Sequence, residues 1–245
     1  MKIIVTVFLV FLASLGVSAQ TFAFVEESQI QLGLDADVNL PLAEYATLTA
    51  GLSDLRQELT FAPLEVNISL TKSATQIQLP LPDGSMRTFR VVESPVMQEA
   101  LQARWPQIRT YRIQDVAAPQ YKGRLTVTPL GITATYTSYE GEVFLEPYAS
   151  NQTVFHVLYY NHDLVLTPEE LPQLACGYEP SETEDPKPID SGVEATTEGE
   201  KTSSPANIRE YIMALTCTGE YATQKGGTVE AVLSSFVTAI NLANA

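Results

Sequence analysis

The sequence contains few basic residues and few cysteines. Its 14 lysines and arginines stand against 29 aspartates and glutamates, which gives a formal net charge of −15 at pH 7. Because nucleic-acid-binding proteins contact phosphates through a basic surface, this balance excludes nucleic acid as an expected partner. The two cysteines are too few for a fold that is held together by disulfides.

The sequence also lacks the motifs of a catalytic centre. It contains no HExxH zinc motif, no glycine-rich phosphate loop and no histidine placed for a catalytic triad. Its two histidines, His156 and His162, do not have the spacing of a recognised zinc-binding pair, and a zinc site needs three or four ligands. We expect both to be ordinary strand and turn residues.

Only one long hydrophobic run is present, at the start of the chain. Lys2 precedes an almost wholly apolar stretch from Ile3 to Val17, and Val17-Ser18-Ala19 has the small residues of a signal-peptide cleavage site. The run is short compared with the ~20 residues that span a membrane. The pattern predicts a signal peptide over residues 1–19 and a secreted product, extracellular or periplasmic, with no membrane contact after cleavage.

Residues 20–178 are predicted to form a β-rich domain, in which apolar and polar residues alternate from Glu65 on, as is typical of half-buried strands. The alternation begins at Val66, Ile68 and Leu70, and the turn residues Pro82–Ser85 then separate the two arms of a predicted hairpin. The hairpin arms and the further strands are expected at Gln76–Leu81, Met86–Val92, Ile108–Ile113, Leu125–Thr128, Ile132–Tyr139, Val143–Tyr148 and Val154–Tyr160.

Two helices are expected among these strands, at Ser53–Leu59 and at Glu93–Trp105, where Pro95 can begin a helix and Pro106 ends it. The region is therefore predicted to have an α+β fold, mainly antiparallel β with one or two helices, and Trp105 is expected in its core. Five arginines are interpreted as a solvated face, with an acidic docking surface as the alternative: Arg87, Arg90, Arg104, Arg109 and Arg112.

The composition changes sharply between residues 179 and 205. Prolines, serines, threonines and eight acidic residues fill this segment, and only Lys187 and Lys201 oppose the negative charge. Because almost nothing in it is large and apolar, we expect a disordered acidic linker between two domains. Proteolysis concentrates in exposed segments of this kind.

Residues 206–245 read as the beginning of a second domain. Tyr211–Thr218 has the apolar character of a strand that Gly219 ends, and Thr228 is placed to cap a helix after the break at Gly226-Gly227. This helix has an apolar face with no later segment to cover it, formed by Val229, Val232, Leu233, Phe236 and Ile240. We therefore expect a truncated α/β domain, a strand plus a helix, that continues past Ala245.

Two stretches carry a resemblance to a known family. The segment YIMALTCTGEY with QKGGT and TVEAVLSSFVTAINLAN resembles the start of the catalytic domain of bacterial reprolysin-like zinc metallopeptidases, which are metzincins. The block DGSMRTFRVVESPVMQEALQARWPQIRTYR resembles the pro-region that precedes this domain. The resemblance implies the N-terminal part of a secreted metalloendopeptidase precursor: a signal peptide, a β-rich pro-region that aids folding and keeps the enzyme latent, and the first part of the catalytic domain.

The same resemblance implies zinc as the cofactor of the full-length protein, with the HExxHxxGxxH motif beyond this chain. The implied partners are the pro-region's own catalytic domain and protein or peptide substrates. Without the motif the chain should be inactive alone. The contrasting hypothesis is a non-enzymatic secreted β-rich module with a binding or inhibitory role.

Cys176 is the one residue expected to take part in the chemistry. A cysteine-glycine pair in the pro-region of some metzincin precursors ligates the zinc, and Cys176-Gly177 stands just before the linker. Two alternatives remain open, a disulfide with Cys217 or an ordinary thiol. Cys217 itself is expected to be a small buried residue of the predicted strand.

Overall fold

The computed structural model describes residues 21–30, 41–149, 152–165 and 213–245. The predicted signal peptide, the acidic linker and Cys176 lie outside these ranges. The described residues up to 165 and residues 217–245 belong to one compact unit, and the architecture below is that of this unit.

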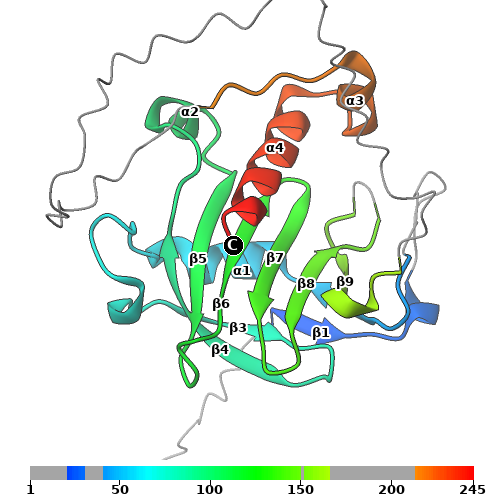
Figure 1. Ribbon diagram of the computed structural model, residues 1–245. Coiled ribbons are helices and arrows are strands. Elements are labelled where there is room, and N and C mark those ends of the chain that lie inside the picture. Colours follow the sequence, from blue (N-terminus) through cyan, green and yellow to red (C-terminus); the bar gives the residue numbers. More distant parts are fainter. Residues whose placement is uncertain (1–20, 31–40, 150–151, 166–212) are drawn as a thin grey trace, which may run out of the picture. The chain divides into compact units, whose positions relative to one another are not determined.

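The described chain forms a single antiparallel sheet of nine strands (Figure 1). In chain order they are β1 (Phe22–Phe24), β2 (Ala46–Ala50), β3 (Gln76–Pro80), β4 (Met86–Glu93), β5 (Arg109–Asp115), β6 (Lys122–Thr128), β7 (Gly131–Thr137), β8 (Glu142–Pro147) and β9 (Phe155–Tyr160). The spatial order is β1-β2-β9-β8-β7-β6-β5-β4-β3. Strands β3 to β9 thus follow one another as neighbours, and β2 joins the sheet beside β9.

The sheet curls into a nearly closed barrel. The Tyr136 hydroxyl on β7 donates a hydrogen bond to the carbonyl oxygen of Pro80 on β3, although three strands separate the two in the sheet. The ring of Tyr136 also meets that of Phe89 on β4 edge to face, with 5.3 Å between their centroids. Alternate residues of the strands fill the interior between these contacts, among them Ile77, Leu79, Phe89, Val91, Ile113, Leu125, Ile132, Ala134, Tyr136, Val143, Leu145 and Leu158.

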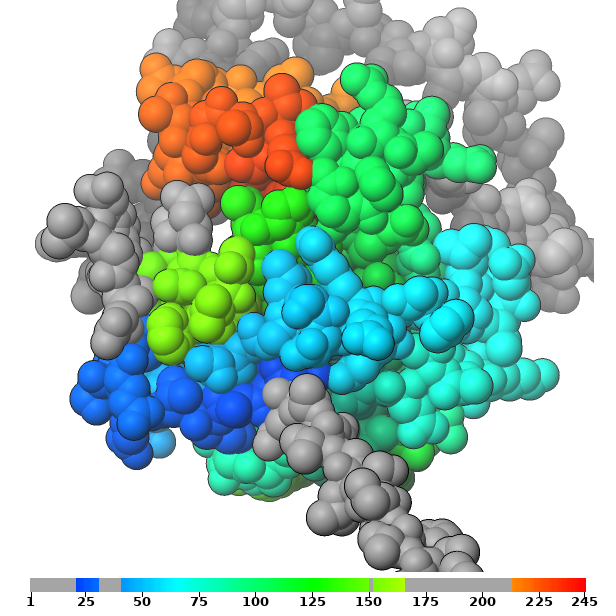
Figure 2. Space-filling model, turned by 180° about the vertical axis from the view of Figure 1, so that it is seen from behind, coloured from blue at the N-terminus to red at the C-terminus, as the bar shows by residue number. Residues whose placement is uncertain are grey.

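The part of the chain that the structure describes also contains four α-helices: α1 (Leu52–Glu58), α2 (Glu99–Arg104), α3 (Gly219–Gln224) and α4 (Val229–Ala243). Short 3₁₀ turns lie at η1 (Glu27–Gln29), η2 (Leu59–Phe61), η3 (Leu70–Lys72) and η4 (Asn161–Asp163). Leu55 of α1 and Leu59 of η2 pack into the barrel core. In the view from behind, the blue and cyan segments between residues 21 and 75 form much of the surface (Figure 2).

Most of the predicted strands are confirmed, because their alternation matches one buried face. The hairpin of β3 and β4 forms with Gly84 at φ +86° in its turn, a conformation that glycine adopts readily. The helix predicted at Ser53–Leu59 is α1. The prediction of a mainly antiparallel β fold with a few helices is therefore confirmed.

Two predictions within the β-rich region are wrong. Residues 65–67 form a turn and residue 68 a bend rather than a strand, and Val66 is 89% exposed. The amide of Asn67 donates a hydrogen bond to the carbonyl oxygen of Leu64, which closes a β-turn. The predicted helix from Glu93 is limited to α2, because Glu93 still belongs to β4 and the Ser94 amide extends the ladder to Thr110.

The strand predicted at Tyr211–Thr218 is also wrong over its described part, since residues 213–218 have no regular structure. Thr218 instead caps α3: its Oγ1 accepts a hydrogen bond from the Tyr221 amide at 3.3 Å. Gly219 therefore begins a helix rather than ending a strand. Cys217, expected to be buried, is exposed.

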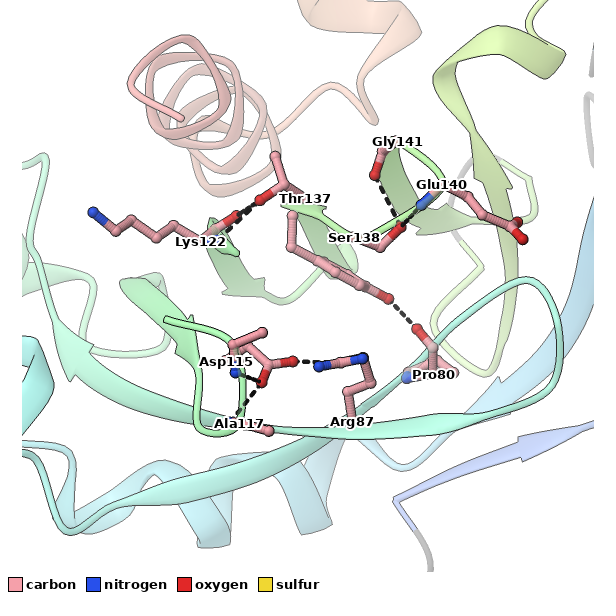
Figure 3. A network of polar contacts seen from close by, with 11 residues as sticks. Pro80, Arg87, Asp115, Ala117, Lys122, Thr137, Ser138, Glu140 and Gly141 are labelled. Carbon is pink, nitrogen blue, oxygen red and sulfur yellow. Dashed lines mark hydrogen bonds and ion pairs between the residues drawn. The ribbon is translucent and has the colours of Figure 1, made fainter. Parts of the chain in front are cut away.

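Three of the five arginines expected on a solvated face, all on β4 and β5, form ion pairs within the molecule. Arg87 pairs with Asp115, a carboxylate that also accepts the amides of Ala117 and Ala118 (Figure 3). Arg109 pairs with Glu93 and Arg112 with Glu65. Although burial opposes it, the Arg87 guanidinium and these two amides keep the pKa of Asp115 below its ordinary value.

Candidate interface between the sheet and the C-terminal helix

Helix α4 forms where the sequence predicts it. Gly226 and Gly227 adopt positive φ angles of 102° and 69°, and the Oγ1 of Thr228 accepts a hydrogen bond from the Ala231 amide at 3.1 Å. Glu230 lies in the first turn, where a negative charge is favourable to the helix dipole. The local sequence thus fixes the start of the helix.

The side of α4 that faces the sheet is made of small and polar residues. Its four buried residues are Ala231, Ser234, Val237 and Asn241, which recur every three or four positions. Its main contact in the sheet is β6, with smaller contacts to β5 and β7 (Figure 1). Short side chains allow the helix backbone to approach the outer face of the sheet closely.

Asn241 makes the most specific contact of this interface. The residue is fully buried, and its Nδ2 donates hydrogen bonds to the carbonyl oxygen of Leu125 at 3.1 Å and to the Oγ1 of Thr126 at 2.9 Å. More than 100 positions of sequence separate the helix from these β6 residues. Because both donors of the amide group are used, the contact fixes the register of α4 along β6.

Both ends of the helix are also tied to the β-rich region. At the N-terminal end, Nε2 of Gln107 bonds to the carboxylate of Glu230. At the C-terminal end, Nε of Arg124 on β6 donates to the carbonyl oxygen of Asn244 at 3.0 Å, where a cation complements the helix dipole. Burial lowers the pKa of Arg124, and the nearby charge of Arg112 lowers it further.

An apolar cluster adds to these polar contacts. Val237 of α4 lies against Met97 and Ile108, all three buried, with the half-buried Leu233 and Trp105 beside them. Trp105, expected in the core, thus lies at the edge of this smaller cluster. Burial of such side chains contributes roughly 1.5–3 kcal/mol each when it is complete.

The uncovered apolar face expected for α4 is present only in part. Val229 is 73% exposed, whereas Val232, Phe236 and Ile240 are partly buried. Phe236 stacks on Tyr221 of α3, with 5.8 Å between ring centroids. The spacing of the apolar residues predicted the helix itself. It did not predict which side of the helix packs on the sheet, because the outer face of β6 presents the polar side chains of Arg124 and Thr126 to α4.

The two histidines have separate local roles, as expected. His156 is a fully buried residue of β9, whose Nε2 accepts from the Ile132 amide at 3.2 Å while Nδ1 lies 3.3 Å from the Val154 carbonyl oxygen. His162 lies in η4 and stacks on Tyr160. Burial lowers the pKa of His156 to about 4, so the ring is neutral at physiological pH.

Within the described residues, no three histidine, cysteine or acidic side chains are grouped so that they could hold a metal ion. No helix among residues 21–30, 41–149, 152–165 and 213–245 has the length and apolar character needed to cross a membrane. Comparison with protein-family models, curated proteins and solved structures gives no match for the chain.

Proposed function

We propose that this chain is the N-terminal part of the precursor of a secreted zinc-dependent metalloendopeptidase, and that its β-rich region is the pro-region. The observation that supports the proposal is the packing of α4 against β6. The segment that resembles the first long helix of the catalytic domain is held on the region that resembles a pro-region through the buried Asn241. A pro-region that aids the folding of its enzyme needs a contact of this kind.

The physical role of the contact is to stabilise a helix that is marginal by itself. Isolated helices of fewer than about 12–15 residues are barely stable in water, because nucleation is unfavourable. Helix α4 spans 15 residues, and the β-rich region supplies an acceptor at Leu125, a hydroxyl at Thr126 and the apolar side chains of Met97 and Ile108. The pro-region would thus hold the first helix of the catalytic domain in place while the rest of that domain folds.

The zinc of the proposed enzyme belongs to residues outside the described ranges. In the precursor, an HExxHxxGxxH segment past residue 245 would hold the metal, which supplies Lewis-acid chemistry for peptide hydrolysis. The described residues take no step in that reaction. Their part is to bind and orient the start of the catalytic domain, and the proposed location of the whole protein is extracellular or periplasmic.

The reading frame beyond Ala245 tests this proposal. We expect it to encode HExxHxxGxxH, and we expect the complete precursor to bind zinc in a one-to-one ratio when it is measured by elemental analysis of the purified protein. A stop codon directly after Ala245, or a continuation without the motif, would contradict the proposal and leave the β-rich binding module as the better hypothesis.

Latency through Cys176 is the second part of the proposal. A thiolate ligand from Cys176 would occupy the coordination position that catalysis requires for water. Serine binds zinc far more weakly, so the complete precursor with Cys176→Ser should hydrolyse peptides before the linker is cut. Cys217→Ser is the matched control and should remain latent.

A disulfide between the two cysteines predicts a different result. Both serine variants would then lose stability to the same extent, and neither would become active early. If Cys176→Ser stays as latent as the parent precursor, the thiol has no part in inhibition.

A further inference from the structure

A groove runs between the C-terminal helices and the outer face of the sheet. Its volume is about 390 Å³, within the range of pockets that hold small ligands. Strands β6 to β8 and their turns provide the floor, while α3 and α4 provide the walls. The polar lining residues that could meet a ligand are Thr133, Glu146, Tyr221, Lys225 and Ser235.

Glu146 is the unusual residue of this groove. It projects from β8 and accepts a hydrogen bond from the Tyr159 hydroxyl at 3.2 Å, and no lysine or arginine of the described ranges forms an ion pair with it. Burial raises the pKa of this carboxyl, although the Tyr159 hydroxyl partly opposes the shift. Desolvation without a cationic partner is costly for a carboxylate, and a bound cation would offset that cost.

The groove holds a second group that attracts cations. The ring of Tyr221 lines its wall, and the Nζ of Lys225 lies 5.6 Å from the centroid of this ring. This geometry is a cation–π contact. The wall of the groove therefore already holds the ammonium group of Lys225. Glu146 on the floor has no ion-pair partner among the lysines and arginines of the described ranges.

We propose that this groove binds the ammonium or guanidinium group of a basic ligand, with Glu146 as its anionic partner. The hydroxyls of Thr133 and Ser235 provide further acceptors for the N–H groups of the ligand. A lysine or arginine side chain of a peptide has the required charge and donors. The inference does not depend on the peptidase proposal, since every residue that it uses belongs to the described chain.

Binding of small probes to the whole chain tests the inference by isothermal titration calorimetry. The charged probes are Nα-acetyl-lysine methylamide and Nα-acetyl-arginine methylamide, and the neutral control is Nα,Nε-diacetyl-lysine methylamide. We expect saturable binding of at least one charged probe and none of the neutral one. Butylamine separates the two sources of the cation: weaker binding of butylamine than of the lysine probe indicates a peptide, and equal binding indicates a free amine.

Substitutions then identify the group responsible. Glu146→Gln should weaken binding of the charged probe at least about tenfold, since a charge-assisted contact is lost. Glu142→Gln is the matched control, because Glu142 lies on the same strand and bonds to Thr135 instead. It should leave the affinity within about twofold.

The variant Lys225→Met tests whether the ammonium group of Lys225 competes with the cation of the ligand for the groove. With Lys225 removed, the charged probe should bind at least as tightly as in the parent chain, because a competing cation is gone. Absence of saturable binding, equal binding of the neutral probe, an unchanged affinity in Glu146→Gln, or loss of binding in Lys225→Met would each overturn the inference.

Discussion

His156 shows how one buried residue sets the pH range in which the fold is stable. Its pKa falls from 6.5 to about 4 because burial disfavours the charged ring. Below pH 6.5 the unfolded chain binds a proton that the folded chain does not. The stability due to the neutral ring is therefore complete above about pH 6.5 and is lost as the pH falls toward 4.

A variant without this ring should lose less stability in acid. Between pH 7 and pH 4.5, the free energy of unfolding of the parent chain should fall by about 2–3 kcal/mol more than that of His156→Gln. Urea unfolding at the two pH values measures the difference. His162→Gln, at an exposed position, should keep the parent's pH dependence. An equal fall in the parent and in His156→Gln would show that the ring does not remain neutral.

Among the residues that hold α4 on β6, we expect Asn241 to contribute most to the stability of the packed helix. Asn241→Ala leaves the Leu125 carbonyl oxygen without its side-chain donor at a buried site, so the change should destabilise the docked helix by about 1–3 kcal/mol. Hydrogen exchange of the α4 amides measures this loss directly. Asn244→Ala is the matched control, since Arg124 bonds to the backbone oxygen of that residue. Equal protection of α4 in both variants would exclude the anchoring role.

At the scale of the element, the close approach of α4 to β6 rests on small side chains. Ser234 is fully buried, and its hydroxyl bonds to the Glu230 carbonyl oxygen within the helix. Ser234→Leu should push the helix away from the sheet and cost about 1–3 kcal/mol through overpacking. Thermal unfolding of the whole chain gives the measurement. Ala239→Leu, at an exposed position of the same helix, should change the stability little; a comparable loss there would mean that helix propensity, not packing, is responsible.

The elements also show what the sequence could predict. Alternation located β6 and β7, runs of β-branched and aromatic residues located β8 and β9, and the Asp83-Gly84 turn located the hairpin of β3 and β4. The same reasoning failed at Val66 and at Thr218, where side chain and backbone hydrogen bonds favour a turn and a helix cap over a strand. Strands β1 and β2 were not predicted. Both are short, and they are held by pairing with each other and with β9, far away in the chain.

The site was harder to predict than the fold. The apolar period of α4 pointed to Val229 and Phe236, whereas the packed side is carried by Ser234 and Asn241. The polar side of α4 packs on the sheet because the neighbouring face of β6 is itself polar. Predicting this would require knowing which strand lies under the helix. The groove at Glu146 joins residues from β8, α3 and α4, so no local pattern could reveal it.

At the scale of the whole molecule, a β-rich region contacts the helix that we propose to be the first of a catalytic domain. The contact is polar at Asn241 and at both helix ends, and apolar at Val237. The acidic segment between residues 179 and 205 is the proposed place of the cut that separates the two parts.

Peptidase activity of the complete precursor, measured before and after a cut between residues 179 and 205, shows whether the chain begins a latent zinc peptidase. We expect that the intact precursor binds zinc but hydrolyses no peptide, that the cut releases activity, and that a zinc chelator abolishes it. A cut precursor that carries zinc and remains inactive after its pro-region has been removed would contradict the proposed function, as would full activity of the uncut wild-type precursor.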